Sequence, residues 1–370
     1  MFLFLSPHFL SVIIFLYLSF LNIDSYHMKY FSLIDVFPSG VIFGIFRNIS
    51  TPSINFRTSI ENFILYFPFL ESMKVLVTGG AGFIGSHIAE YFAEAGNTVR
   101  IIDNLATGFI QNIVQYKNIE FIQGDICDYF SVEKAVSGMD YVFHEAALVS
   151  VPLSCERPAE AFRVNTLGTL NVLQACVKAE VNKFVIASSA AVYGNNPILP
   201  KSEDMYPEPT SPYAISKLDG EYLARMFYKE QGLRTTCLRY FNVYGPRQNP
   251  KSQYAAVIPI FLERTREGKD LVIYGDGFQS RDFVHFKDVV RANALALEYG
   301  DGQVFNVAMG KSVTVRELAE NIIKLTESPS RIVHVAPRVG DVRDSRADVS
   351  KISTWWKGEI ELHEGLKSLI

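Results

Sequence analysis

From Met73 onward the sequence predicts an α/β fold in which helices cover both faces of a doubly wound, parallel sheet. Two observations lead to this prediction. Segments of helical spacing alternate with short apolar runs, which are KVLVTG, TVRIID, IEFIQG, YVFHEAA and KFVIASS, and a glycine-rich turn joins the first run to the first helical segment. Buried parallel strands read as continuous apolar runs, and strands that alternate with helices indicate βαβ units.

Residues 1–72 differ in composition from the rest of the chain. They hold 13 of the 28 Phe but only three of the 35 Lys and Arg residues, and neither helical nor strand periodicity persists in them. The apolar run over residues 9–21 resembles a signal or anchor segment, yet no basic residue precedes it and it is shorter than the roughly 20 residues that cross a bilayer. Two interpretations stay open: a membrane anchor in residues 1–21, or a reading frame that truly starts at Met73.

Composition excludes some classes of function. The formal net charge of −4 provides no basic surface for a polyanion, so we expect no nucleic-acid partner. The four cysteines are scattered without a CxxC pair, which argues against a zinc site and against a disulfide framework; they are Cys127, Cys155, Cys176 and Cys237. We therefore expect no metal and a cytoplasmic protein, with membrane attachment only if residues 1–21 are a real anchor.

The first motif lies where the first strand turns into the first helix. Glycines at 79, 82 and 85 follow the strand Val75–Val77 and open a helix that we expect to begin near Ile84. Gly79 would permit the tight turn, Gly82 the approach of backbone to a pyrophosphate, and Gly85 close packing of helix on strand. This placement favours a Rossmann-type dinucleotide site over a plain glycine-rich turn.

The second apolar strand, Val99–Ile102, ends in Asp103. A carboxylate at this place accepts hydrogen bonds from the adenosine ribose and repels the additional phosphate of NADP. We therefore predict NAD as the cofactor. The competing interpretation is an Asp that caps the following turn.

Tyr213 and Lys217 lie four residues apart in SPYAISK, in a segment that we expect to be helical after Pro212. This spacing puts both side chains on one helical face. The pKa of free tyrosine is about 10, so Tyr213 acts as a base at neutral pH only if nearby positive charge favours its phenolate. Lys217 and a nicotinamide ring can supply that charge. The pair is a weak signal alone, because a Tyr and a Lys share a face on many helices.

A serine pair ends the strand Lys183–Ala187, about 24 residues before Tyr213. Parallel sheets place ligand sites at the carboxyl ends of their strands. We expect the Ser189 hydroxyl to bond a substrate oxygen beside Tyr213. The alternative is a serine that only caps a turn or a helix.

These motifs together carry a resemblance to a known family. TGGAGFIGSH, HEAA, SSAAVYG, SPYAISK, LRYFNVYGPRQ and RDFVHFKD occur in one order along the chain. Residues 73 to about 365 thereby resemble the extended short-chain dehydrogenase/reductase superfamily, and within it the UDP-glucose and UDP-N-acetylglucosamine 4-epimerases. The cofactor-binding residues expected from the motifs and the resemblance are Gly79, Gly82, Phe83, Ile84, Gly85, Asp103, Asn104, Asp125, Ile126, Ala146, Ala147, Asn165, Ser188, Tyr213 and Lys217. The substrate-binding residues it implies are Ser189, Asn242, Arg281, Arg338, Asp341 and Ser345, and the catalytic ones are Ser189, Tyr213 and Lys217.

The predicted organisation has an N-terminal extension, 1–72, and two domains. An NAD-binding domain spans 73–242, with the chain returning to it near 282–310. A smaller nucleotide-sugar-binding domain is formed by 243–281 and 311–370. The resemblance also implies a homodimer, in which helices near 164–181 and 211–231 pair across a two-fold axis.

The reaction that the resemblance implies is 4-epimerisation of a UDP-hexose. Tyr213 removes the proton of the sugar 4-hydroxyl while hydride passes to NAD, and hydride then returns to the opposite face of the 4-keto sugar. Dehydratases of the family carry an Asp-Glu pair where this chain has Ala190 and Ala191, so dehydration is disfavoured. The small Ser345 suggests room for N-acetylhexosamines beside plain hexoses.

Three alternatives stay open at this stage. UDP-glucuronate decarboxylases share the Ser, the Tyr, the Lys and the glycine motif. A sensor that binds NAD or a nucleotide sugar without turnover would use the same fold. A membrane-bound sugar-modifying enzyme would require residues 1–72 to act as an anchor.

Overall fold

The computed structural model describes residues 31–36, 42–46, 72–249, 256–337 and 343–370, and the chain forms two compact units, Met1–Glu71 and Ser72–Ile370. In the first unit, strands β1 (Phe31–Val36) and β2 (Ile42–Phe46) pair antiparallel. The apolar run over residues 9–21 lies outside the described residues. Across the described ranges, no helix combines the length and the apolar character that a membrane crossing requires. The predicted cytoplasmic location stays a prediction.

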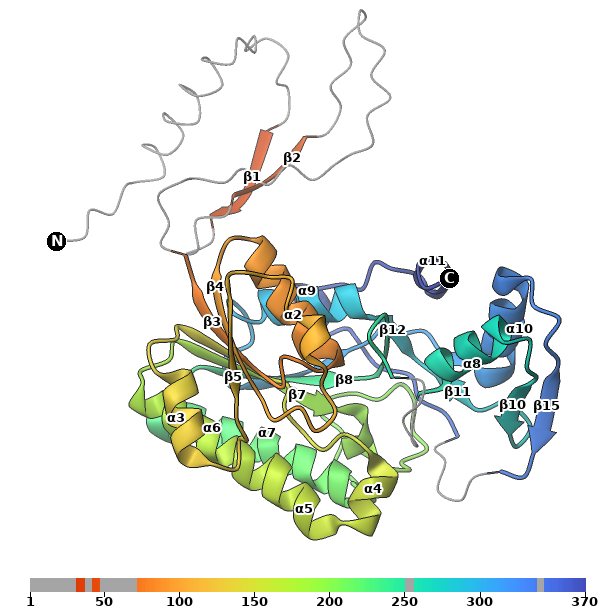
Figure 1. Ribbon diagram of the computed structural model, residues 1–370, viewed down its shortest axis with the longest axis horizontal. Helices are drawn as coiled ribbons and strands as arrows, with labels where there is room; N and C mark the ends of the chain where they lie inside the picture. Colours follow the sequence, from red (N-terminus) through yellow and green to blue (C-terminus); the bar gives the residue numbers. More distant parts are fainter. Residues whose placement is uncertain (1–30, 37–41, 47–71, 250–255, 338–342) are drawn as a thin grey trace, which may run out of the picture. The chain divides into compact units, whose positions relative to one another are not determined.

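A seven-stranded parallel sheet organises the second unit (Figure 1), in the order β13-β8-β7-β6-β3-β4-β5. Its strands are β3 (Lys74–Thr78), β4 (Thr98–Asp103), β5 (Ile119–Gln123), β6 (Tyr141–His144), β7 (Lys183–Ser189), β8 (Thr235–Tyr240) and β13 (Gln303–Val307). From β3 the chain builds outward through β4 and β5, then crosses to β6 on the other side of β3. Ligands bind at such a reversal in doubly wound sheets. The predicted fold class is confirmed.

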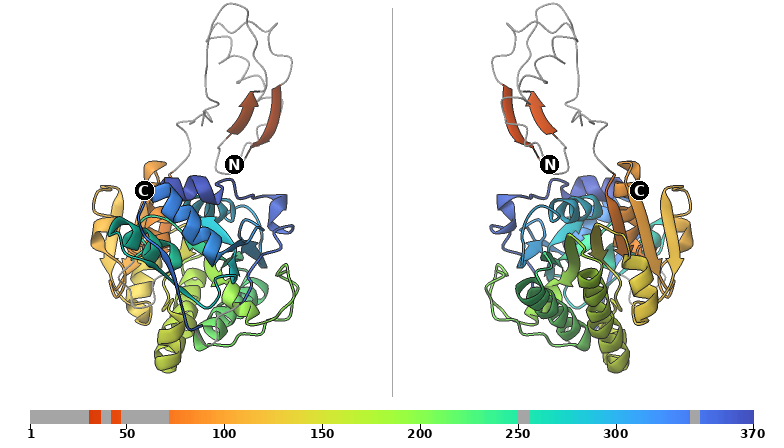
Figure 2. Two further views of the ribbon diagram at one scale, coloured as in Figure 1. Left: turned by 90° about the vertical axis from the view of Figure 1, so that its right-hand side faces the viewer. Right: turned by 90° about the vertical axis from the view of Figure 1, so that its left-hand side faces the viewer.

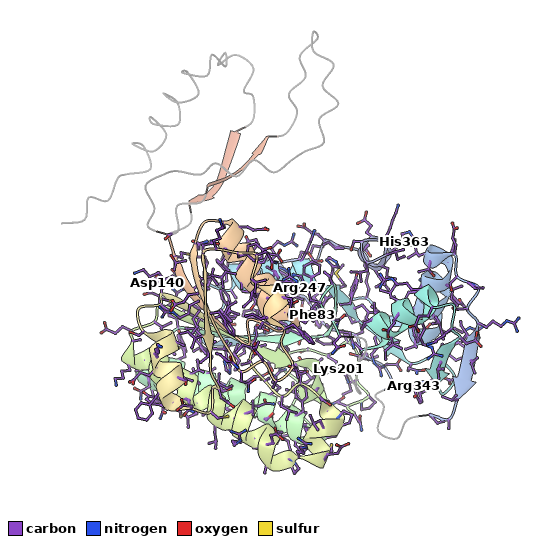
Figure 3. The ribbon with its side chains drawn as sticks, viewed as in Figure 1. Phe83, Asp140, Lys201, Arg247, Arg343 and His363 are labelled. Atoms are coloured by element: carbon purple, nitrogen blue, oxygen red, sulfur yellow. The ribbon has the colours of Figure 1, made fainter. Side chains whose placement is uncertain are left out.

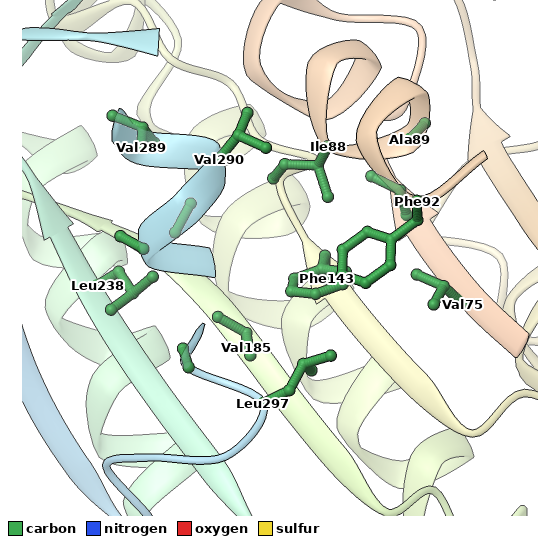
Figure 4. Packing of buried hydrophobic residues seen from close by; sticks show 14 of the residues in the cluster. Val75, Ile88, Ala89, Phe92, Phe143, Val185, Leu238, Val289, Val290 and Leu297 are labelled. Atoms are coloured by element: carbon green, nitrogen blue, oxygen red, sulfur yellow. The ribbon is translucent and has the colours of Figure 1, made fainter. Parts of the chain in front are cut away.

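Helices cover both faces of this sheet, as Figure 1 and the two side views in Figure 2 show. One face carries α2 (Phe83–Glu94) and α9 (Phe286–Leu295), and the other carries α3 (Tyr129–Val136), α6 (Thr169–Lys178) and α7 (Pro212–Gln231). Two apolar layers result, one under each set of helices. Figure 4 shows the layer under α2 and α9, where the rings of Phe92 and Phe143 lie 5.1 Å apart. The strands are apolar on both sides because both faces are covered.

Shorter elements complete the unit. Beside α7 lie α4 (Val151–Glu156), α5 (Pro158–Phe162) and a π-helical turn (Arg163–Gly168). Three small sheets follow β8: β9 (Asn242–Tyr244) with β12 (Phe283–His285), β10 (Leu271–Tyr274) with β15 (Ile332–Val335), and β11 (Ser280–Arg281) with β14 (Val313–Thr314). A third apolar cluster joins α8 (Val257–Arg266), α10 (Val315–Thr326) and α11 (Leu362–Lys367). The predicted division of residues 73–370 into two domains stays a prediction.

The helix predicted after Pro212 is confirmed, and its ends have local causes. Pro212 occupies the first helical position, where its missing N–H costs no hydrogen bond. The Ser211 hydroxyl caps this end by accepting from the Ala214 N–H at 3.2 Å. At the other end Gly232 adopts φ +71°, which ends the helix with a left-handed turn. The start of α7 is therefore fixed beside the ends of the strands.

We predict that Phe143→Ala destabilises the protein by about 3 to 5 kcal/mol, because the side chain is fully buried and its removal leaves a cavity against Phe92. The matched control is Phe130→Ala, whose ring is 78% exposed on α3. It should cost less than about 0.5 kcal/mol. Urea unfolding midpoints measure both effects. Equal losses in the two variants would contradict the packing described for the sheet.

Candidate active site

Three predicted catalytic side chains meet at the carboxyl edge of the sheet. Ser189 ends β7 and Tyr213 lies in the first turn of α7, where interaction with the Ser189 hydroxyl lowers the pKa of the Tyr213 phenol. The Lys217 ammonium donates to the Ala187 carbonyl at 2.8 Å and lies 6.0 Å from the centroid of the Tyr213 ring. Ser189 also accepts from the Ala191 N–H at 3.1 Å, so it caps the following turn as well as contacting the tyrosine. Their chemical roles stay predictions.

Burial perturbs the charged states at this edge. It raises the pKa of Tyr213, which the hydrogen bond from Ser189 opposes and the charge of Glu145 reinforces. It lowers the pKa of Lys217 to about 8, and the carboxylate of Glu145 opposes this change. Burial also raises the pKa of Glu145 to about 7. Removal of the Tyr213 proton therefore depends on positive charge close to the phenol.

The glycine turn has the geometry of a phosphate-binding turn. Gly79 has φ +66°, and a Cβ there would lie 2.7 Å from the backbone of Ala146. A Cβ on Gly85 would lie 2.4 Å from the Gly79 carbonyl oxygen, so the helix packs directly on the turn. The helix α2 begins at Phe83, one residue before the predicted start. In the described chain no side chain caps this end and no acidic residue lies in its first turn. Its N–H groups thus face outward as donors for a pyrophosphate.

The predicted adenosine-binding residues gather at the ends of β4 and β5. The Asp103 carboxylate accepts from the Ala81 N–H at 3.0 Å and from the Leu105 N–H at 2.8 Å. It therefore caps its own turn and also borders the glycine turn. Asn104 donates to Asp125 at 3.4 Å. Ile126 is buried behind them.

Other predicted cofactor residues use their polar groups within the protein. The Ala146 N–H donates to the Thr78 hydroxyl at 3.2 Å, with Ala147 next in the chain. Asn165 lies in the π-helical turn; its amide accepts from the Leu148 N–H at 2.7 Å and donates to the Ser216 hydroxyl at 2.9 Å. π-Helical turns are frequent at functional sites. The contacts of these residues with a cofactor stay predictions.

A buried ion pair near the predicted catalytic side chains was not predicted from the sequence. The Arg239 guanidinium of β8 donates two hydrogen bonds of 2.8 Å to the carboxylate of Glu221 on α7. The Ser188 hydroxyl donates to the same carboxylate, so this side chain faces the pair. Glu221 lies one turn beyond Lys217 and two turns beyond Tyr213. That i, i+4, i+8 spacing of polar residues was the signal that could have revealed it.

A cavity of about 390 Å³ lies between β9, β11 and α8. Asn242 and Arg281, both predicted to hold the nucleotide, line it together with Gln248, Gln279, Arg264, Phe261 and Tyr274. The Ser345 N–H donates to the Ser280 carbonyl at 3.1 Å, which places Ser345 beside Arg281. Arg338 and Asp341 lie outside the described residues. Ser189 and Tyr213 are not among the residues that line the cavity, so the two ends of the predicted site are distinct.

Arg247 joins the segment after β9 to α2, the helix that begins at Phe83, and both residues are labelled in Figure 3. Its guanidinium donates to the Ser86 hydroxyl at 3.1 Å and pairs with the Glu90 carboxylate at 2.9 Å. Its backbone has φ +67°, which residues other than glycine rarely adopt. This residue was not predicted. Its place in the motif YGPRQ gave no hint of its partner.

The profile of the NAD dependent epimerase/dehydratase family matches residues 75–308. The chain belongs to this family. A UDP-glucose 4-epimerase from Thermotoga maritima, solved with UDP-glucose, is similar to the chain, with 41% identity and a TM-score of 0.77 over 80% of this chain and 96% of that one.

Two further relatives have similar coverage. A UDP-glucose 4-epimerase from Thermus thermophilus, solved with NAD, shows 38% identity and a TM-score of 0.74 over 80% of this chain and 97% of that one. A UDP-N-acetyl-alpha-D-glucosaminuronate decarboxylase from Bacillus cytotoxicus is 36% identical over 312 residues, which are 80% of this chain and 96% of the relative.

The predicted family, NAD cofactor and enzyme class, an isomerase, are confirmed by these relationships. The residues of this chain fit a dinucleotide on structural grounds. The close approach of Gly79 to Ala146 leaves no room for a Cβ in the turn, and the first turn of α2 presents unused N–H donors to an anion. Asp103 borders the same turn.

We predict that Gly79→Ala lowers the affinity for NAD by about tenfold or more, because the new methyl group would displace Ala146 and the turn. Gly96→Ala is the matched control. Gly96 also has a positive φ, +81°, but nothing lies within 4 Å of a Cβ there. Calorimetric titration with NAD should therefore show an affinity for this variant within about twofold of the unsubstituted protein. Equal weakening of both variants would show that backbone strain alone, and not the close approach, is responsible.

Proposed function

We propose that the protein is an NAD-dependent UDP-hexose 4-epimerase that works through a transient 4-keto sugar. Its substrates are UDP-glucose and UDP-galactose, and the small Ser345 leaves room for the N-acetylhexosamine forms. One observation supports this proposal: the Ser189 hydroxyl interacts with the phenol of Tyr213, and the Lys217 ammonium lies 6.0 Å from the centroid of the same ring. Such an arrangement suits a base and a hydrogen-bond donor that act on one sugar hydroxyl.

The residues of the chain have separate tasks in this reaction. Tyr213, as phenolate, takes the proton of the sugar 4-hydroxyl and later returns it. Ser189 bonds the same sugar oxygen and steadies the phenol. Lys217, held by the Ala187 carbonyl at 2.8 Å, supplies positive charge that favours the phenolate. NAD, held at the glycine turn and Asp103, would supply the hydride acceptor and donor for the sugar 4-carbon.

The residues after Ser189 support epimerisation against dehydration. Ala190 and Ala191 occupy the positions where dehydratases of the family that the chain resembles carry an acid and a base. Methyl groups transfer no protons. The Ala191 N–H is already bonded to the Ser189 hydroxyl. This turn therefore gives a substrate neither a proton donor for a leaving hydroxyl nor a cation for a carboxylate.

The nucleotide would be held at the other end of the site. Asn242 and Arg281 line the 390 Å³ cavity, and a guanidinium suits a diphosphate because its donors match the phosphate oxygens. Arg338 and Asp341 are proposed, from the resemblance alone, to complete this end. Binding energy placed on the nucleotide leaves the sugar free to turn over between the two hydride transfers.

The homodimer is part of the same proposal. Of the apolar side chains on α7, Phe227 is buried in the core, whereas Tyr222 and Met226 are 56% and 46% exposed. Leu167, in the π-helical turn, is 55% exposed. These exposed side chains lie on the two helical segments that the resemblance pairs across a two-fold axis.

A decarboxylase is the second candidate, since a relative with 36% identity carries that name. A protein that binds its ligands without turnover is the third. Incubation of the purified full chain with UDP-glucose, UDP-galactose, their N-acetyl forms and UDP-glucuronate, with products resolved by NMR, separates all three. Interconversion of C4 epimers supports the proposal. Release of carbon dioxide from UDP-glucuronate, or bound NAD without any conversion, would overturn it.

We predict that Tyr213→Phe lowers kcat by about 10² to 10⁴, because the base is lost while the ring still fills its place. The affinity for the UDP-sugar should change little, since the nucleotide end of the site is untouched. The control is Tyr206→Phe, which removes a phenol that is 82% exposed and should leave kcat unchanged. Steady-state kinetics and ligand titration measure both. A Tyr213→Phe variant with full kcat would remove the residue from the mechanism.

A further inference from the structure

Glu145 is a carboxylate at the catalytic edge of the sheet that the proposed mechanism does not use. It directly follows β6, and its backbone N–H donates to the Thr78 carbonyl. The Tyr240 hydroxyl, from the end of β8, donates to its Oε1 atom at 2.8 Å. The side chain of Glu145 therefore reaches across the end of β7, the strand that carries Ser189.

The hydrogen bonds around Glu145 run in one direction. Asn293 of α9 is fully buried, and its Nδ2 atom donates to the Val289 carbonyl at 2.9 Å and to the Tyr240 hydroxyl oxygen at 2.7 Å. The carbonyl of Val289 can only accept, which fixes the orientation of the amide. The Tyr240 proton is therefore directed to Glu145. The end of β8, through Tyr240, and α9, through Asn293, thus hold the Glu145 carboxylate as a hydrogen-bond acceptor.

The charges that face Glu145 come from α7. His144 pairs with Ile186, so Glu145 is level with Ala187, whose carbonyl accepts from the Lys217 ammonium at 2.8 Å. Burial raises the pKa of Glu145 to about 7, and its charge opposes the fall in the Lys217 pKa and adds to the rise in the Tyr213 pKa. From β8 it faces Tyr240, whose pKa is raised far above its ordinary range by burial. His144 faces Lys217 from β6, but burial lowers its pKa to about 3, so the ring is neutral at physiological pH. Thr78 and Asn293 add no charge.

We propose that Glu145 is a positioning residue whose charge sets the pH range in which Lys217 stays an ammonium while Tyr213 can become a phenolate. As a carboxylate it stabilises the ammonium and opposes the phenolate, because opposite charges attract and like charges repel across a partly buried site. As a neutral acid it does neither. This inference rests on the proposed function for its effect on turnover, but its effect on Tyr213 does not need turnover.

The first test is the pH dependence of kcat/KM in Glu145→Gln, a change that keeps the shape of the side chain and an acceptor for Tyr240. The alkaline limb, where Lys217 loses its charge, should move to lower pH by about one unit. The acid limb should move less, because Glu145 is already largely protonated below neutral pH in the unsubstituted protein. A residue that only supports the fold would leave both limbs in place, and that result would overturn the proposal.

A second variant keeps the test decisive if Glu145→Gln folds poorly. Tyr240→Phe removes the hydroxyl that stabilises the ionised carboxylate, so Glu145 stays protonated to higher pH. The alkaline limb should again move to lower pH, by less than in Glu145→Gln. Glu133→Gln is the control, since that carboxylate lies on α3, pairs with the exposed Lys178 of α6 and should shift neither limb. A Tyr240→Phe profile unchanged from that of the control would count against the proposal.

The decisive readout uses the phenol itself. The ultraviolet difference spectrum between the purified full chain and its Tyr213→Phe variant isolates the phenolate of Tyr213 during an alkaline titration. Repeated in the Glu145→Gln background, the midpoint should fall by about one unit, because Glu145 is fully charged in this range. An unchanged midpoint overturns the proposal even if the protein is an active epimerase. A lowered midpoint upholds it even if no UDP-sugar is epimerised, in which case only the proposed function fails.

Discussion

The parallel register of β6, β7 and β8 is the constraint on which the rest of the site depends. His144 pairs with Ile186, and Ser189 pairs with Tyr240, so the three strands end at one edge within a few residues of each other. Parallel strands present their carboxyl ends together, which brings Glu145, Ser189 and Tyr240 to the same place. The helix α7 then supplies Tyr213 and Lys217 to that edge. A shift of one residue in this register would turn Ser189 to the other face of the sheet.

A buried ion pair between Arg239 and Glu221 holds α7 against this edge, and the burial of its two charges costs solvation free energy. Glu221 and Arg239 are both 4% exposed, and such a pair gives up solvation that its mutual attraction repays only with good geometry. The two hydrogen bonds of 2.8 Å between them provide that geometry. Because Glu221 follows Tyr213 and Lys217 on one helical face, the pair fixes the rotation of the helix about its axis. The desolvation of this pair is therefore offset by a defined position of Tyr213 and Lys217 at the edge of the sheet.

Local signals in the sequence predicted the fold and part of the site. The glycines from 79 to 85, the apolar strands and the start of α7 at Pro212 depend on neighbouring residues only, so the sequence reasoning placed them within one or two positions. The partners of Glu145, Arg239 and Arg247 depend on which distant elements pack together. Arg239 meets Glu221 only because β8 lies beside β7 under α7. A charged residue next to an apolar strand does not reveal such a partner. The HEAA motif therefore indicated the family but gave no role to its glutamate, Glu145.

The two ends of the proposed site differ in their polar contacts, and this difference suits the proposed reaction. At the nucleotide end, the buried Asp282 carboxylate accepts from the Met309 N–H at 2.9 Å and the Ala347 N–H at 3.1 Å, while its carbonyl accepts from the Asn242 N–H at 3.0 Å. One residue beside Arg281 thus fastens three distant segments around the cavity. At the other end, the proposed contacts to the sugar are the Ser189 hydroxyl and the Tyr213 phenol, with the methyl groups of Ala190 and Ala191 following Ser189. An enzyme that inverts a single carbon must hold its substrate firmly through the nucleotide and loosely at the reacting ring, and the polar residues that line the cavity contrast in this way with the few groups at Ser189 and Tyr213.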